Sequence, residues 1–265
     1  DLLTQEQIGM VISHIRSLCT EAAWPLGDLN LPRPLVTEKA FPENETVIAG
    51  TITGNPVVLR GATWNGLGDG AGAFVISGSD TFATGRIAPD QTIEVADADT
   101  PTFSESTFLN VTDGFANDGA LTLTNTSSVA PHSVMVGPAN ATLVNRGTLT
   151  TTGPATINLR LYVRNDGTLE ARAGELRMDY NRTLTNNGTL VLRAGAQLWT
   201  NGDVVQPAAS VIEFHASGPT TVGHIVNGSG NPAGVPLGGR ARPVFVAPYL
   251  PTAGTRLTIV DGAHQ

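Results

Sequence analysis

From about residue 45 onward, short runs rich in Val, Ile, Leu and Thr alternate with Gly, Asn, Asp and Pro. Short apolar runs that are bounded by turn-forming residues predict β-strands. The beginning of the chain differs, because apolar residues recur at helical spacing over residues 4–19, and Thr4 with Gln7 fits a capping box. The pattern therefore predicts an all-β body that follows one amphipathic helix.

Three segments are expected along the chain. Residues 1–24 contain the helix, and residues 25–44 read as a proline-rich connector. The β body occupies residues 45–265, with the clearest repeats in 115–200 and the closing strands in 204–262.

One motif, Asn-x-Gly-Thr/Ala-Leu, occurs four times in the β body. Its asparagines and glycines are Asn117 and Gly119, Asn145 and Gly147, Asn165 and Gly167, and Asn186 and Gly188. The motif glycines are separated by 28, 20 and 21 residues. A second set, Gly153, Gly174 and Gly195, keeps the same period with two spacings of 21 residues. Two independent markers therefore share one repeat length.

A repeat of this length with glycine at fixed points predicts a parallel β-solenoid, or β-helix, with coils of about 20–21 residues. We expect Asn and Gly at the corners because these residues tolerate positive φ, and we expect the motif leucines of successive coils to stack in one core. The alternative is an antiparallel β-sandwich, in which Asp166-Gly167 and Asn187-Gly188 form hairpin turns.

Three strings carry a family resemblance: Val144-Asn-Arg-Gly-Thr-Leu149, Val163-Arg-Asn-Asp-Gly-Thr-Leu169 and Leu184-Thr-Asn-Asn-Gly-Thr-Leu190. They resemble the degenerate repeats of bacterial surface β-solenoids, the passenger domains of autotransporters and haemagglutinin-like adhesins. The resemblance covers roughly residues 45–262. It implies a non-catalytic, secreted or cell-surface module that serves as a structural, adhesive or assembly unit of a larger extracellular protein or filament. It implies no catalytic residues.

A solenoid exposes unpaired backbone at its two ends, and these ends must be covered. The apolar face of the helix at residues 4–19 is suited to cap the first coil, or to contact a second copy or an adjoining domain. We therefore expect partners at this helix and at the solenoid ends.

Composition narrows the classes of partner. The 265 residues include 15 Lys and Arg against 23 Asp and Glu, a formal charge of −8. This acidity disfavours a nucleic-acid protein, which needs concentrated positive charge. No window approaches the roughly 18 consecutive apolar residues of a membrane-spanning helix, so we expect no membrane insertion.

Positive charge is nevertheless concentrated in the repeats. Residues 141–200 contain seven Arg and four acidic residues, which gives 7 − 4 = +3. Arg172 and Arg193 are one period apart, so the solenoid stacks them on one face. Together with Arg160 they are the candidate contact for an anionic partner such as a surface glycan. The alternative is that Glu170 and Glu175 neutralise these arginines across neighbouring coils.

Other candidate chemistry is weaker. The segment Gly66–Gly72 has glycine at every second position, which predicts a flexible loop and offers only Asp69 as a calcium ligand. Asp97 and Asp99 would share one face of a strand, as the paired carboxylates of a glycan-cleaving β-helix of the phage-tailspike or polysaccharide-lyase type could. We expect this acidic stretch to be a solvated loop, and the glycan-binding or glycan-cleaving β-helix remains the alternative function.

Histidines offer the remaining candidate. Glu213 and His215 project from one face of a predicted strand, and His224 follows nearby. The spacing matches no known metal-ligand pattern. We therefore expect surface histidines, no catalytic residues, no metal and no cofactor.

Overall fold

The structure is a computed structural model. It describes residues 54–78, 81–96, 98–100, 103–105, 107–126, 134–228 and 238–262. The helix predicted at residues 4–19, the whole segment 1–24 and the connector 25–44 lie outside the described residues.

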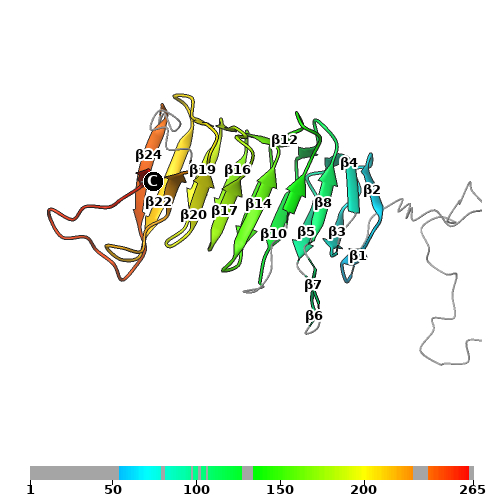
Figure 1. Cartoon of the computed structure of the whole chain (residues 1–265), viewed down its shortest axis with the longest axis horizontal. Coiled ribbons are helices and arrows are strands. Elements are labelled where there is room, and N and C mark those ends of the chain that lie inside the picture. The colour runs from blue at the N-terminus through cyan, green and yellow to red at the C-terminus, as the bar shows by residue number, and fades with distance from the viewer. Residues whose placement is uncertain are drawn as a thin grey trace, which may run out of the picture. The chain divides into compact units, whose positions relative to one another are not determined.

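One wall of the body is a nine-stranded sheet (Figure 1). Its strands, in spatial order, are β1 (Val57–Leu59), β3 (Gly72–Ile76), β5 (Gln91–Ala96), β10 (Ala120–Thr124), β13 (Thr148–Thr152), β16 (Thr168–Ala171), β19 (Thr189–Leu192), β22 (Val211–Ala216) and β24 (Arg240–Phe245). Successive members are one coil apart along the chain, so the coils stack in sequence order.

The other walls form a second sheet that is continuous through β4. One stack contains β21 (Val204–Val205), β18 (Leu184–Asn186), β15 (Tyr162–Asn165), β12 (Thr142–Asn145) and β9 (Ala116–Asn117), which pairs with the end of β4 (Thr81–Ile87). From β4 the sheet continues through β8 (Phe108–Val111), β11 (Val134–Val136), β14 (Thr156–Arg160), β17 (Glu175–Met178), β20 (Gln197–Thr200), β23 (His224–Asn227) and β25 (Val260–Gly262), and β2 (Thr63–Gly66) also pairs with β4.

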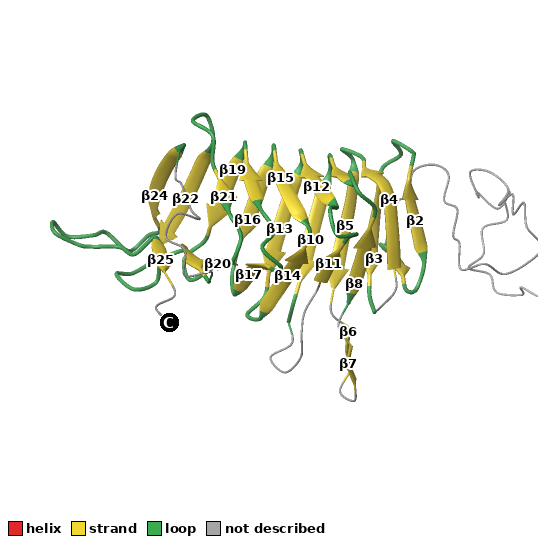
Figure 2. Cartoon of the chain, turned by 45° about the horizontal axis from the view of Figure 1, so that its top comes forward, coloured by secondary structure: helices red, strands yellow, loops and turns green. Residues whose placement is uncertain are grey.

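Every strand pairing within these two sheets is parallel. The chain is therefore a parallel β-solenoid, and the antiparallel sandwich is wrong. Gly167 and Gly188 do not turn hairpins, because each lies between strands of different walls, β15 and β16 or β18 and β19. One small hairpin, β6 (Ala98–Thr100) with β7 (Phe103–Glu105), is antiparallel and projects from the body (Figure 2).

The predicted leucine stack is confirmed. Leu121, Leu149, Leu169 and Leu190 are aligned in successive parallel strands, and all four are fully buried. Ile212 continues the column. Among the described residues of 115–200, the one buried aromatic side chain is Phe115. It packs edge-to-face on the buried Trp64 of a flanking coil, as Phe74 does, with ring centroids 6.1 Å apart in both pairs. A narrow repeat core thus explains the low aromatic content.

The motif asparagines have a function that the sequence analysis missed. Each is fully buried, and the Nδ2 of one donates to the Oδ1 of the next, at 2.7 Å from Asn117 to Asn145, 2.6 Å from Asn145 to Asn165 and 2.7 Å from Asn165 to Asn186. The same Nδ2 also donates to a backbone carbonyl of the next coil, such as Thr168 for Asn145 (2.9 Å). We call these four residues the asparagine ladder. It joins four coils inside the core.

The expected positive φ at the motif glycines is wrong. Positive φ occurs instead at the second set of repeated glycines, at 114° for Gly153, 65° for Gly174 and 82° for Gly195. The motif glycines are needed for close packing instead. A Cβ on Gly167 would lie closer than 3.0 Å to the carbonyl oxygen of Gly147, and one on Gly147 would meet Gly119 in the same way. Successive corners therefore approach too closely for any side chain.

The strand β24 closes the nine-stranded sheet in a way that opposes further pairing. Arg240 and Val246 direct their N–H groups toward β22 and the residue next to it. Amide groups alternate in direction along a strand, so those of residues 241, 243 and 245 point away from the body. Among the described strands, none pairs with this outer edge of β24, and Pro243 has no N–H to offer there. Proline at an edge discourages the addition of another strand.

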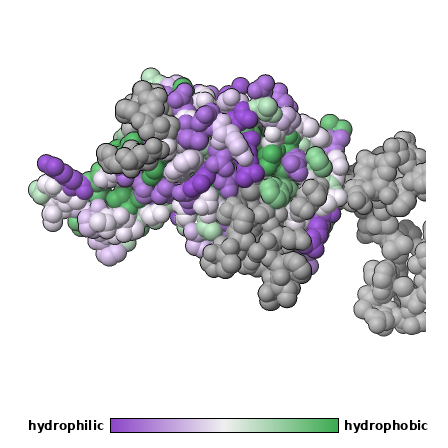
Figure 3. All heavy atoms as spheres, in the orientation of Figure 1, coloured by the Kyte–Doolittle hydropathy of each residue, from purple (hydrophilic) through white to green (hydrophobic). Residues whose placement is uncertain are grey.

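The side chains at this end are exposed, including Phe245 at 41%. On the face shown in Figure 3, hydrophilic residues dominate the middle of the described body, and hydrophobic residues gather nearer its two ends. Polar side chains that could form a binding site are therefore expected along the walls of the solenoid.

Candidate functional site

The outer face of the nine-stranded sheet brings two of the predicted arginines together. Arg172 follows β16 and Arg193 follows β19, and these strands pair directly. Both arginines bind one carboxylate, because Glu170 accepts from Arg172 Nε at 3.0 Å and from Arg193 Nε at 2.6 Å. The stacking of Arg172 and Arg193 on one face is confirmed, and so is their partial neutralisation by Glu170.

The charged row continues onto the next two strands. Arg193 Nη1 lies 3.3 Å from His215 Nδ1, and His215 Nε2 lies 3.1 Å from an oxygen of Glu213. A guanidinium can only donate, so Nδ1 accepts in this contact and Nε2 donates to Glu213. Glu213 also accepts from Arg242 of β24. We call Arg172, Arg193 and Arg242 the arginine strip.

Within this row the acidic side chains are largely buried, whereas the arginine side chains are exposed. The carboxylate side chains of Glu170 and Glu213 are only 9% and 14% exposed. The side chains of Arg172, Arg193 and Arg242 are 57%, 47% and 63% exposed. The acids therefore lie beneath the arginines, and the surface that solvent meets is cationic.

The arginines also keep the carboxylates ionised. Burial by itself would raise the pKa of Glu170, but hydrogen bonds from Arg193 and Arg172, together with their charges, outweigh burial and hold this pKa below its ordinary value. Burial likewise opposes ionisation of Glu213, and hydrogen bonds from His215 and Arg242 lower its pKa overall. Both carboxylates are thus built to stay charged.

Arg160, the third predicted arginine, is not part of this face. It ends β14 in the other sheet, where its Nε lies 3.7 Å from Asp179 and its guanidinium lies over the ring of Tyr180, 5.6 Å from the centroid. Glu175 does not neutralise the strip either, because it accepts from Arg177 at 2.7 Å. The single predicted face is therefore two separate surfaces.

Glu213 and His215 project from β22 on one side, as strand alternation predicts. The expectation of a surface histidine is wrong for His215, which is buried against Glu213 and Arg193. His224 does not join them, because it lies in β23 of the other sheet and its Nδ1 contacts the carbonyl of Val222 at 3.1 Å. Within the residues that the structure describes, no group of three or more metal-ligating side chains comes together.

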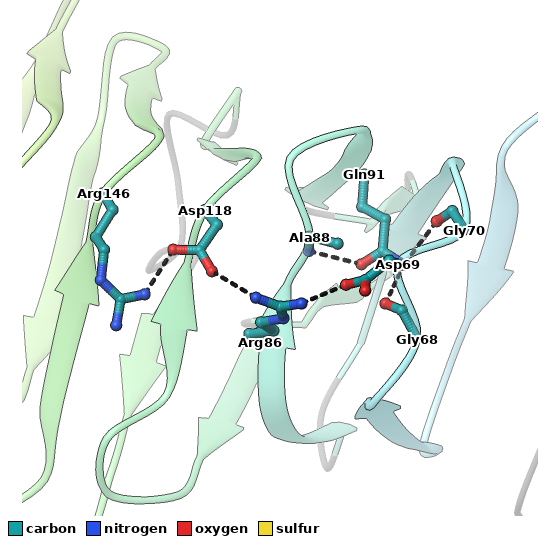
Figure 4. A network of polar contacts seen from close by, with 8 residues as sticks. All are labelled: Gly68, Asp69, Gly70, Arg86, Ala88, Gln91, Asp118 and Arg146. Atoms are coloured by element: carbon teal, nitrogen blue, oxygen red, sulfur yellow. Dashed lines mark hydrogen bonds and ion pairs between the residues drawn. The ribbon is translucent and has the colours of Figure 1, made fainter.

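The glycine-rich segment Gly66–Gly72 is tied to the coils beside it (Figure 4). Gln91 Nε2 donates to the carbonyls of Gly70 at 2.9 Å and Gly68 at 3.4 Å. Asp69 pairs with Arg86. Asp69, the one possible calcium ligand here, is thus engaged by a guanidinium.

The acidic stretch gives little support to a catalytic pair. Asp97 lies outside the described residues, and Asp99 belongs to the β6–β7 hairpin. Glu94 on β5 accepts from the hydroxyl of Thr124 at 2.8 Å. The paired-carboxylate hypothesis for Asp97 and Asp99 stays untested.

A group of arginines packs on aromatic rings, which charge and repeat spacing did not predict. Arg160-Leu-Tyr162 in one coil faces Tyr180-Asn-Arg182 in the next, so that each arginine covers the tyrosine of the other triplet. The signal was present in the sequence as two reversed triplets about one period apart.

Comparison with protein-family models, with curated proteins and with solved structures found no match. Of the described part of the chain, no helix is both long and apolar enough to cross a membrane. Function is therefore inferred from the geometry of the solenoid surface.

Proposed function

We propose that this chain is a non-catalytic β-solenoid module of a secreted or cell-surface protein, with a structural and adhesive function. The observation that supports this proposal most is the arginine strip, which is a solvent-facing row of guanidiniums on a scaffold of stacked coils. The asparagine ladder and the close glycine corners favour a stiff scaffold, which suits the display of such a row.

The strip is suited to an extended anionic polymer. From β16 through β19 and β22 to β24 there are three strand spacings, about 14 Å along the solenoid. Guanidinium groups bind carboxylates and sulfates through paired hydrogen bonds. Arg172 and Arg242 each use one nitrogen for the contacts described above, so they keep further donors for a ligand. The partner proposed is an acidic polysaccharide that lies along the rod.

The charge states of the strip favour binding over cleavage. Glycoside hydrolysis by two carboxyl groups needs one of them protonated near neutral pH, which requires a raised pKa. Glu170 and Glu213 both have lowered pKa values, and Val191 separates them in the strand register. These two acids are therefore suited to hold arginines, not to protonate a leaving group.

A binding experiment on the intact chain tests the proposal. The protein is passed over immobilised heparin, polygalacturonate and, for comparison, neutral dextran. We expect retention on the two polyanions that weakens with added salt, and none on dextran. Replacing Arg172 and Arg193 together by Gln should weaken binding about tenfold, or about 1.4 kcal/mol.

The matched control replaces Arg146 and Arg164 by Gln. It removes the same charge from two arginines that pair with Asp118 and Asp166 at another corner. This control should bind within about twofold of the original protein. The proposal is wrong if both double variants bind equally, or if the original protein binds neither polyanion.

A further inference from the structure

A second surface, on the other sheet, combines aromatic rings with arginines. Arg160 lies over Tyr180, Arg182 over Tyr162 at 4.9 Å and Arg177 over Trp199 at 4.4 Å, each distance taken to the ring centroid. These residues come from β14, β17 and β20, which pair in that order, from β15, which follows β14 along the chain, and from the turn after β17. We call the six residues the arginine–aromatic corner.

The turn at the centre of this corner is strained. Tyr180 and Asn181 have φ values of 59° and 55°, and the turn is closed by the N–H of Arg182, which donates to the carbonyl of Asp179 at 3.3 Å. Asparagine tolerates this conformation, but a bulky residue such as tyrosine rarely adopts it. Strained backbone that a structure retains is a pointer to function.

The strained conformation of Tyr180 does not place its side chain in the hydrophobic core. Its side chain is 64% exposed, so the ring is displayed to solvent although glycine or asparagine would fit the turn better. Arg160 lies over one face of this ring. The turn is further fixed from the next coil, since Asn201 Oδ1 accepts from the N–H of Asn181 at 3.1 Å.

Polar and charged side chains lie beside the rings. Gln197 Nε2 donates to Glu175 at 3.0 Å, and the same carboxylate accepts from Arg177. Arg160 lies near Asp179, so most charges at the corner are already balanced. Each of the three rings has an arginine over it, so this described surface differs from the contiguous apolar centre that protein partners bury.

We infer that the arginine–aromatic corner binds a pyranose ring of an oligosaccharide, with Tyr180 as the stacking platform. A pyranose has an apolar C–H face and a rim of hydroxyls, and the corner offers a displayed aromatic ring bordered by amides, carboxylates and guanidiniums. The near balance of charge lets the sugar be neutral or acidic. This site lies on a different sheet from the arginine strip and does not depend on it.

The test measures binding of cellohexaose and of hexagalacturonate to the whole chain by calorimetry. We expect binding of at least one hexasaccharide. Tyr180→Gly should weaken it about fivefold to tenfold while the thermal midpoint stays equal or rises, because the turn loses its strain. Tyr180→Phe should bind within about twofold, since the ring remains.

Leu250→Ala is the control, because Leu250 is a large hydrophobic residue far along the chain that is even more exposed than Tyr180, at 82%. It should leave saccharide affinity unchanged. The inference is overturned if neither hexasaccharide binds, or if Tyr180→Gly binds as well as the original protein. Binding that is lost in the Arg172 and Arg193 double variant but kept in Tyr180→Gly would assign the saccharide to the arginine strip alone and also overturn it.

Discussion

The side-chain amide of Asn145 donates to the side-chain oxygen of Asn165 at 2.6 Å, inside the core and between two coils. The two asparagines are aligned across β12 and β15, and the side-chain amide donates toward the later coil, whereas the backbone N–H of Asp166 donates back to the carbonyl of Asn145. A buried amide that is fully paired stabilises one register, since a shift by one residue would leave it without partners. The ladder thus fixes how the coils stack.

Breaking the ladder in its middle should be costly. In Asn165→Ala, the amide of Asn145, the oxygen of Asn186 and the carbonyl of Thr189 all lose a partner. At about 1 kcal/mol or more for each buried group, we expect a loss of about 3 kcal/mol in urea unfolding. Asn165→Asp should be worse at neutral pH, because a buried carboxylate cannot donate.

The control is Asn140→Ala, at an exposed turn. It should change stability by less than about 0.5 kcal/mol. Equal midpoints for Asn140→Ala and Asn165→Ala would show that the ladder does not stabilise the solenoid.

Glycine at the motif corner should be irreplaceable for steric reasons. Gly167→Ala would place a methyl group closer than 3.0 Å to the backbone of Gly147, so we expect a loss of about 2–3 kcal/mol. Gly68→Ala is the matched change, because a Cβ there would meet nothing within 4 Å. Thermal unfolding of the two variants should differ clearly, and a Gly167→Ala protein as stable as Gly68→Ala would contradict the close approach.

Acid should weaken the nine-stranded sheet through Glu170. A carboxyl whose pKa is lowered on folding stabilises the protein above its unfolded pKa, about 4.3, and this contribution is lost as pH falls through the folded value. Stability should therefore fall below about pH 4.5. In Glu170→Gln this part of the fall should be absent, at a cost of about 1–2 kcal/mol near neutral pH.

Arg193→Met gives the complementary measurement. It removes one of the two donors to Glu170, so the folded pKa of this carboxyl moves up toward its unfolded value, and less stability should be lost on acidification than in the original protein. Denaturant midpoints measured from pH 3 to pH 7 would show both effects. If the denaturant midpoint changes with pH in the same way for the original protein, Glu170→Gln and Arg193→Met, then Glu170 has the same pKa in the folded and unfolded states.

Pro243 should limit end-to-end association at β24. Replacing it by Val restores an N–H that points away from the body on the free edge, and edge strands with complete donors recruit further strands. We expect Pro243→Val to associate with increasing concentration in sedimentation experiments. Pro154→Val, at an exposed corner between β13 and β14, should sediment as the original protein does. Identical behaviour of the two variants would rule out a role for Pro243.

Much of the fold follows from the sequence because repetition is a long-range signal. Leu149 and Leu169 are predicted to stack from their motif alone, and they do. The physical reason for the motif was not accessible in the same way. Asn165 and Gly167 were expected to provide backbone freedom, whereas one makes a buried amide ladder and the other permits close contact between corners. Spacing reveals that a residue recurs, not which of its properties the fold uses.

The candidate site was predictable only in part. Arg172 and Arg193 share a face because they share a phase of the repeat. Arg160 was assigned to that face by charge alone. A solenoid has several walls, however, and the position of a residue within its coil determines on which wall it lies. The packing of Arg160 on Tyr180 depends on the conformation of a turn, which the period does not determine.

The most direct test of a binding module without catalysis is size-exclusion chromatography of the intact protein mixed with polygalacturonate oligomers of one defined length. The account predicts that the oligomer elutes with the protein at low salt and is recovered at its original length. Failure to co-elute would contradict the proposed adhesive function, and recovery of shortened oligomers would contradict the absence of catalysis.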